Sequence, residues 1–167
     1  MSQGSGQEAL AVRTALADIV TAYAMALDAR DWAGFRGLFE DEIDIDYSSL
    51  GSIHARIAAC VWVDRCKVLG AFDATQHKVS NFVSEVAGDE AQVTTYVDAG
   101  HFISDGGAEL QGYACGTYRH HLRHGAAGWK IAGCAFTVAG YAGGRAAFDR
   151  AFDAARARFA QQQETAS

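Results

Sequence analysis

Clustered basic residues are missing from this sequence. The chain has 167 residues with 14 Lys and Arg against 20 Asp and Glu, which gives a formal net charge of −6. Proteins that bind a phosphate backbone need clustered Lys and Arg to displace counterions. We therefore expect no nucleic-acid partner. Proline is also absent, and the sequence offers no physical reason for this.

Long apolar runs and targeting signals are missing as well. No run approaches the ~18 uninterrupted apolar residues of a membrane helix. Residues 1–10 lack the basic stretch followed by an apolar stretch that makes a secretory signal. We therefore expect a cytoplasmic protein with no membrane partner. Half of the residues are apolar and 20% are charged, a composition typical of a globular domain.

The sequence also lacks a metal-binding or disulfide pattern. Its four cysteines form no CxxC pair, and each lies in an apolar run, where a free Cys behaves as a small hydrophobe. The His residues form no HExxH or HxH motif, and the adjacent His120 and His121 would point to opposite faces of a strand. We expect no metal, no other cofactor, and reduced core cysteines. These are Cys60, Cys66, Cys115 and Cys134.

Helical spacing marks the first part of the chain and its end. Apolar residues recur every three or four positions over residues 7–29, which predicts a long amphipathic helix. Asp31 is a candidate N-cap for a short second helix. Residues 53–72 return to helical spacing, and a closing helix is expected over residues 145–160. Helices therefore flank the middle of the sequence.

The middle of the sequence predicts strands. Residues 42–49 alternate with period two, which places Tyr47 on the buried face of a half-buried strand. Four further strand-like segments follow, separated by turns rich in Gly and Asp, which is typical of an antiparallel meander. We expect one α+β domain over residues 8–160, with residues 1–7 and 161–167 as tails.

A curved sheet wrapped around helices would leave an apolar cavity with a few inward polar groups, which the closing helix could lid. Asp28 lies near the end of the first helix, where the helix dipole disfavours a carboxylate, so a partner such as His77 is expected. Tyr47 and His101 fall on inward faces by their parity. Taken singly, a lone strand His is more often structural, and a helix-end Asp more often solvated. The pattern alone leaves this choice open.

Several segments, taken in order, resemble a known family. They are "YAMALDARDWAGFRGLF", "IDIDYSS", "LGAFDATQH", "GYACGTYRHHLRHGAAGWKIAG" and "FDRAFDAARARF". This series resembles scytalone dehydratase and, more widely, the SnoaL-like branch of the nuclear transport factor 2 (NTF2) superfamily. The resemblance runs from about residue 9 to residue 159, which is nearly the whole chain.

The resemblance implies an α+β cone whose pocket is closed by helices. It also implies loss of water from a cyclic hydroxy-ketone without a metal or an organic cofactor. By position in the motifs, the family's dyad Asp falls on Asp28 and its proton-transferring His on His77. A tyrosine that holds the substrate carbonyl through water falls on Tyr47, and a second pocket His falls on His101.

Some positions depart from the family pattern. Leu27 stands where a second carbonyl-side tyrosine is expected, and Tyr23, one helical turn earlier on the same face, could supply that hydroxyl. Gly116 and Tyr118 stand where the family has a substrate-binding Ser and Asn. A pocket that loses such partners should prefer a substrate other than scytalone. The candidate substrate-binding residues are Tyr118, Gly116, Leu27, Trp62 and Phe148.

The sequence therefore predicts an acid–base hydro-lyase that acts on a small hydrophobic cyclic β-hydroxy carbonyl compound. The same groups could isomerise a steroid-like ketone or cyclise a polyketide, because both reactions also begin with an enolate. A non-catalytic role stays open, either as a ligand-binding module or as an accessory subunit like the β subunits of aromatic-ring dioxygenases. The resemblance further implies a homo-oligomer, a trimer or a dimer.

Overall fold

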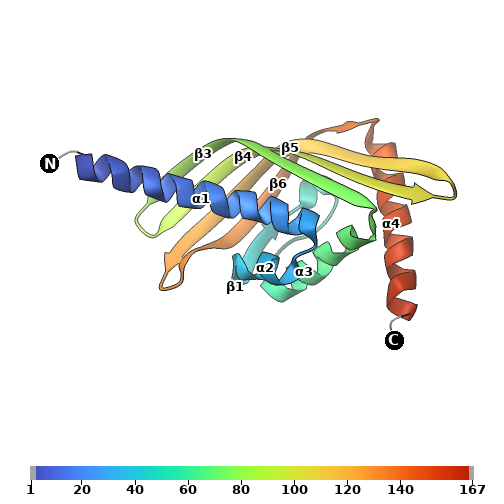
Figure 1. The fold of residues 1–167 in the computed structure, drawn as a ribbon, viewed down its shortest axis with the longest axis horizontal. Coiled ribbons are helices and arrows are strands. Elements are labelled where there is room, and N and C mark those ends of the chain that lie inside the picture. Colours follow the sequence, from blue (N-terminus) through green and yellow to red (C-terminus); the bar gives the residue numbers. More distant parts are fainter. Residues whose placement is uncertain (1–2, 166–167) are drawn as a thin grey trace.

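The structure is a computed structural model that describes residues 3–165 (Figure 1). Four α-helices, two short 3₁₀ helices (η) and six strands follow one another along the chain. In order they are α1 (Gln3–Ala29), α2 (Trp32–Gly37), β1 (Phe39–Asp46), η1 (Ser48–Leu50), β2 (His54–Ala58), α3 (Ala59–Cys66), η2 (Lys67–Ala71), β3 (Ala74–Ala87), β4 (Glu90–Asp105), β5 (Ala108–Gly125), β6 (Gly128–Ala142) and α4 (Arg145–Thr165).

The six strands form one sheet in the order β2-β1-β6-β5-β4-β3. The predicted α+β class and the antiparallel meander from β3 to β6 are confirmed. One pair differs from the expected antiparallel arrangement, because β1 runs parallel to β6. Parallel neighbours cannot be joined by a tight turn, and here all of β2 to β5 lies between them in the chain.

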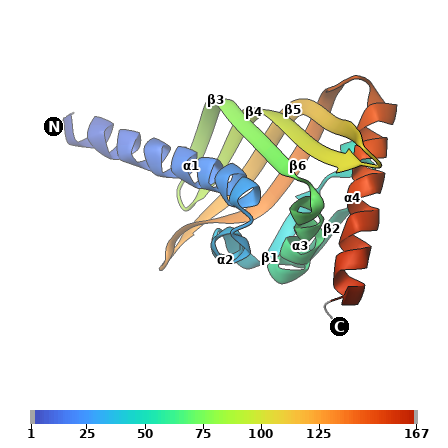
Figure 2. The ribbon, with the colours of Figure 1, turned by 45° about the vertical axis from the view of Figure 1, so that its right-hand side comes forward.

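Helix α1 crosses the sheet, and α4 lies at the far end from the start of α1 (Figures 1 and 2). The buried stripe of α1 contains Leu16, Val20, Tyr23 and Leu27. Leu10, six positions before Leu16, lies about 120° around the helix from it and is 65% exposed, in the first turns of α1, which project beyond the strands (Figure 1). By length and composition alone α1 would also suit a membrane span, yet this stripe packs it as a core helix.

Two element boundaries differ from those expected. Residues 54–58, expected in a helix, form β2 and pair antiparallel with β1, because sheet pairing overrides a weak local preference. Residues 3–7 and 161–165, expected in tails, extend α1 and α4. Gln7 is a good helix former and not a capping residue, so nothing stops the helix there. The rest of the expected tails lies outside the described residues.

The smaller sequence predictions mostly hold. Asp31 caps α2, with its Oδ1 accepting a hydrogen bond from the Gly34 N–H at 2.9 Å. The cysteines are free, as expected. However, only Cys66 and Cys134 are buried, whereas Cys60 is exposed. Cys60 lies in the first turn of α3, outside the helix face that buries Ala59, Trp62, Val63 and Cys66.

Candidate active site

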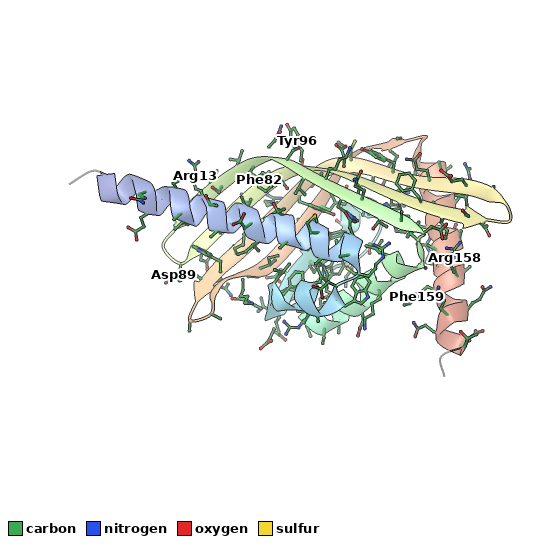
Figure 3. All side chains as sticks on the ribbon, viewed as in Figure 1. Arg13, Phe82, Asp89, Tyr96, Arg158 and Phe159 are labelled. Atoms are coloured by element: carbon green, nitrogen blue, oxygen red, sulfur yellow. The ribbon has the colours of Figure 1, made fainter. Side chains whose placement is uncertain are left out.

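A cavity of about 670 Å³ opens between the sheet and the helices α1, α3 and α4. Its size is ordinary for a small-molecule site. Phe148, Phe152 and Phe159 of α4 line one wall, and Figure 3 shows Phe159 on the side of α4 that faces α3. The expected residues that line the cavity are Tyr23, Leu27, Tyr47, Trp62, His77, His101, Tyr118 and Phe148.

Asp28 and His77 form a hydrogen-bonded pair, and His77 lines this cavity. The Asp28 Oδ1 lies 2.7 Å from the His77 Nδ1, and the Asp28 Oδ2 accepts the His77 backbone N–H, also at 2.7 Å. The side chain of His77 is only 4% exposed. Because the carboxylate takes Nδ1, the imidazole turns its other nitrogen to the cavity side.

Electrostatics keep Asp28 ionised. Burial works to raise the pKa of Asp28, but hydrogen bonds from the His77 ring, the His77 backbone and Thr75 outweigh it, so the pKa is lowered. The carboxylate is therefore an acceptor at neutral pH, and the proton shared with the ring resides on His77 Nδ1. In the neutral ring, this tautomer leaves the lone pair on His77 Nε2, which is the nitrogen that a general base would use.

His101 adjoins His77, with the two ring centroids 5.2 Å apart. Its Nδ1 lies 2.9 Å from the Gly112 carbonyl oxygen. A carbonyl only accepts, so Nδ1 carries the proton and Nε2 carries a lone pair. Burial, and then the charge of His77, lower the pKa of His101 to about 3. His101 is therefore a neutral acceptor in the cavity, not a proton donor.

The tyrosine hydroxyls meet on the other wall. Tyr23 and Tyr47 share a hydrogen bond of 2.8 Å between their hydroxyl oxygens, and Cys134 Sγ lies 3.7 Å from Tyr47 Oη and 3.9 Å from Tyr23 Oη. Burial raises the pKa of both tyrosines, so both stay protonated. Tyr23 thus reaches the place for which it was a candidate, beside Tyr47, although its side chain is fully buried.

One predicted site residue lies elsewhere. Gly116 does not line the cavity. It sits at a register shift between β5 and β6, where an added Cβ would stand 2.1 Å from the Thr137 carbonyl oxygen. Close backbone approach, not ligand binding, therefore explains this glycine.

Sequence reasoning missed three residues around the site. Thr75 donates to Asp28 Oδ1 at 2.9 Å, and Arg30 donates to Thr75 Oγ1 at 2.6 Å. Thr75 lies two positions before His77 on β3, so period two could have placed it on the same face. His120, expected to be structural or on the surface, is fully buried against Tyr23. No sequence signal marks Arg30.

Among residues 3–165, no group of three His, Cys, Asp or Glu side chains is placed to hold a metal ion. The polar groups that line the cavity are instead suited to hydrogen bonding and proton transfer. They include an Asp-held imidazole, a neutral imidazole acceptor and a pair of hydroxyls, beside the polar and charged side chains of Ser52, Arg65, Arg145, Asp149 and Arg156. Such a set can remove a proton, hold it, and donate hydrogen bonds to an oxygen that gains charge.

Comparison with known protein families identifies the family to which this chain belongs. A SnoaL-like domain model matches residues 8–135, most of the chain. The chain belongs to the SnoaL-like family. Comparison with curated proteins gives no match. The expected resemblance and the NTF2-like fold class are therefore confirmed for this SnoaL-like domain.

Solved structures agree on the fold of the SnoaL-like domain. A proposed scytalone dehydratase from Novosphingobium aromaticivorans has a TM-score of 0.73 and 19% identity, covering 82% of this chain and 90% of its own. An NTF2-like protein with a cystatin-like fold, from the same species, has a TM-score of 0.63 and 18% identity, covering 86% and 93%.

A third similar structure is a type 2 hexachlorocyclohexane dehydrochlorinase, with a TM-score of 0.66 and 16% identity, covering 82% of this chain and 91% of its own. At these identities the likeness shows the fold of the SnoaL-like domain. The reaction has to be argued from the residues in the cavity.

Proposed function

We propose that this SnoaL-like protein is a cofactor-independent acid–base lyase that removes water from a small cyclic β-hydroxy carbonyl compound. The observation that carries the proposal is the 2.7 Å contact between Asp28 Oδ1 and His77 Nδ1, with His77 lining the cavity between the sheet and the helices. The names of two similar structures, a proposed dehydratase and a dehydrochlorinase, also denote eliminations. We expect a homo-oligomer.

His77 starts the proposed reaction. Its Nε2 takes the proton alpha to the substrate carbonyl, because a positioned imidazole can act as a general base. Asp28 accepts a hydrogen bond from Nδ1–H throughout, holds the ring in one tautomer and stabilises the imidazolium that forms. The C–H electron pair moves into the enolate.

Tyr47 supports the enolate oxygen. If Tyr23 donates its hydroxyl proton to Tyr47 across their 2.8 Å contact, the Tyr47 proton is free to point toward the substrate carbonyl. A donor already in place in a buried site stabilises developing charge without reorganising. The enolate then collapses and expels the β-hydroxyl group.

The leaving group needs a proton, and His77 is the group that can return it. Nε2 of the imidazolium gives its proton to the departing hydroxide, which leaves as water when the hydrogen and the hydroxyl lie on the same face of the ring. His101 is not available as a donor, because its Nδ1 proton is committed to the Gly112 carbonyl oxygen. We instead assign His101 Nε2 as an acceptor for a substrate hydroxyl.

A substrate screen tests the proposal. Cyclic β-hydroxy ketones are incubated with the protein, and mass spectrometry detects loss of one water; an isomerisation would conserve mass. His77→Gln should lower the rate by ~10²–10⁴-fold, the usual worth of a general acid–base group. His121→Gln is the matched control, because His121 lies on the outer side of the same sheet, 40% exposed. A folded His77→Gln variant with wild-type turnover would end the proposal.

A further inference from the structure

Arg30 adopts a backbone conformation that a long side chain rarely takes. Its φ is +59°, and α1 ends there in a Schellman motif, with Arg30 N bonded to Leu27 O at 3.2 Å and Asp31 N to Ala26 O at 3.0 Å. Glycine is the usual residue at this left-handed position because it has no Cβ. Keeping arginine there costs backbone strain, so its side chain is expected to make a compensating contribution.

The guanidinium of Arg30 turns back over the end of α1. Its Nη1 lies 2.9 Å from the Leu27 carbonyl oxygen and 3.1 Å from the Asp28 carbonyl oxygen. The same nitrogen donates to Thr75 Oγ1 at 2.6 Å. A positive group thus lies at the helix end that the dipole makes negative, and beside a carboxylate that the dipole disfavours.

These contacts fix the direction of the next hydrogen bond. A guanidinium only donates, so Thr75 Oγ1 is the acceptor from Arg30. The single hydroxyl proton of Thr75 is then directed to Asp28 Oδ1, 2.9 Å away. Together with the backbone and ring N–H groups of His77, this gives the Asp28 carboxylate three donors. Neither oxygen can rotate away from His77 without losing one of them.

We propose that Arg30, acting through Thr75, is a positioning residue that locks the Asp28 carboxylate and so keeps His77 protonated on Nδ1 with Nε2 free for the cavity. The inference rests on the proposed role of His77, but its structural claim concerns only the tautomer of a ring. It can therefore be tested in the absence of any substrate.

The test is ¹⁵N NMR of the histidine rings in the full-length protein at pH 7.5, where the ring nitrogen shifts report which nitrogen carries the proton. Arg30→Gly removes the guanidinium and gives the left-handed position its preferred residue, so the fold should be kept. We expect wild-type His77 to be Nδ1-protonated and Arg30→Gly to gain an Nε2-protonated population. Thr75→Val should do the same, because it cuts the relay in the middle.

Asn81→Gly is the matched control. Asn81 is the other described non-glycine residue with positive φ, at +55°, and it also lies on β3. This substitution makes the same backbone change without touching the relay, and should leave the His77 tautomer unchanged. A wild-type tautomer in both Arg30→Gly and Thr75→Val would overturn the inference, as would an equal change in Asn81→Gly.

Once a substrate is found, the same variants give a second readout. Removing an outer hydrogen-bond partner of a metal-bound histidine typically costs about 10–100-fold. We expect a loss in kcat of the same order here, with KM little changed. A shifted tautomer in a protein that dehydrates nothing would support the role of Arg30 while rejecting the proposed reaction. The two failures are thus distinguishable.

Discussion

Replacing Tyr23 and Tyr47 by Phe, singly and together, should show that their hydroxyls stabilise the domain as a pair. The two oxygens lie 2.8 Å apart in a buried site. Either single change removes the 2.8 Å partner of the remaining hydroxyl, and the Cys134 sulfur lies farther away, at 3.7 Å from Tyr47 Oη or 3.9 Å from Tyr23 Oη. A buried hydroxyl that loses its partner costs about 1–3 kcal/mol of unfolding free energy.

The double variant removes both hydroxyls and leaves neither stranded. Its loss of unfolding free energy should therefore be smaller than the sum of the two single losses, by about 1 kcal/mol. Urea unfolding followed by tryptophan fluorescence suits the measurement, since the Trp62 ring lies 4.8 Å from the Tyr47 ring. Protein concentration must be held constant because an oligomer gains stability by mass action.

Tyr96→Phe provides the control for this cycle. Tyr96 is 58% exposed, as its outward position in Figure 3 also shows, so the change should leave the unfolding free energy within about 0.5 kcal/mol. Additivity of the Tyr23 and Tyr47 changes to within ~0.3 kcal/mol would refute the reasoning. The two hydroxyls would then contribute independently to the unfolding free energy, and Tyr23 would not orient the Tyr47 hydroxyl.

Two further predictions concern acid stability and α4. The pKa of His101 is lowered to about 3 by burial and then by His77. Between pH ~6.5 and 3, the unfolded chain therefore binds a proton that the folded chain does not. The unfolding free energy falls on acidification in this window, by up to ~1.4 kcal/mol per pH unit. His101→Gln should make the slope of unfolding free energy against pH below 6 shallower, and an unchanged slope would contradict this. Arg158 links α4 to Ala71 O at 2.9 Å and to Asp73 Oδ1 at 2.6 Å. Arg158→Ala should speed chymotryptic cleavage in α4. Arg156→Ala, which loses a contact within the helix, should not. Equal cleavage rates in the two variants would show that Arg158 does not hold α4 in place.

The parts of the fold that repeat along the sequence could be predicted. The stripe of α1 and the inward parity of Tyr47 and His101 follow from periods of 3.6 and 2, and the structure buries these residues as expected. β2 could not be predicted, because its five residues become a strand only by pairing with β1. β2 begins at His54, close in the chain to the end of β1 at Asp46, yet their pairing does not show in the helical spacing of residues 53–72.

The candidate site also has residues that could be predicted from the sequence and residues that could not. The sequence order of Asp28 and His77 suggested a pair, and the resemblance gave the reason to take it seriously. Arg30 escaped prediction because its role depends on a left-handed backbone at φ +59°, which nothing in "DARDW" announces. Gly116 was misassigned because a glycine that permits close backbone approach looks, in a sequence, like one that makes room for a ligand.

The parallel pairing of β1 with β6 determines the order in which the protein can be assembled. Tyr47 follows β1 and Cys134 lies on β6, and 87 positions separate these contacting residues. A nascent chain therefore holds β1 with one edge unpaired until nearly all of the domain has been synthesised. The tyrosine wall of the cavity is completed among the last parts of the fold. A fragment that ends before β6 would keep Asp28 and His77 in its sequence and still lack a place to bind a ligand.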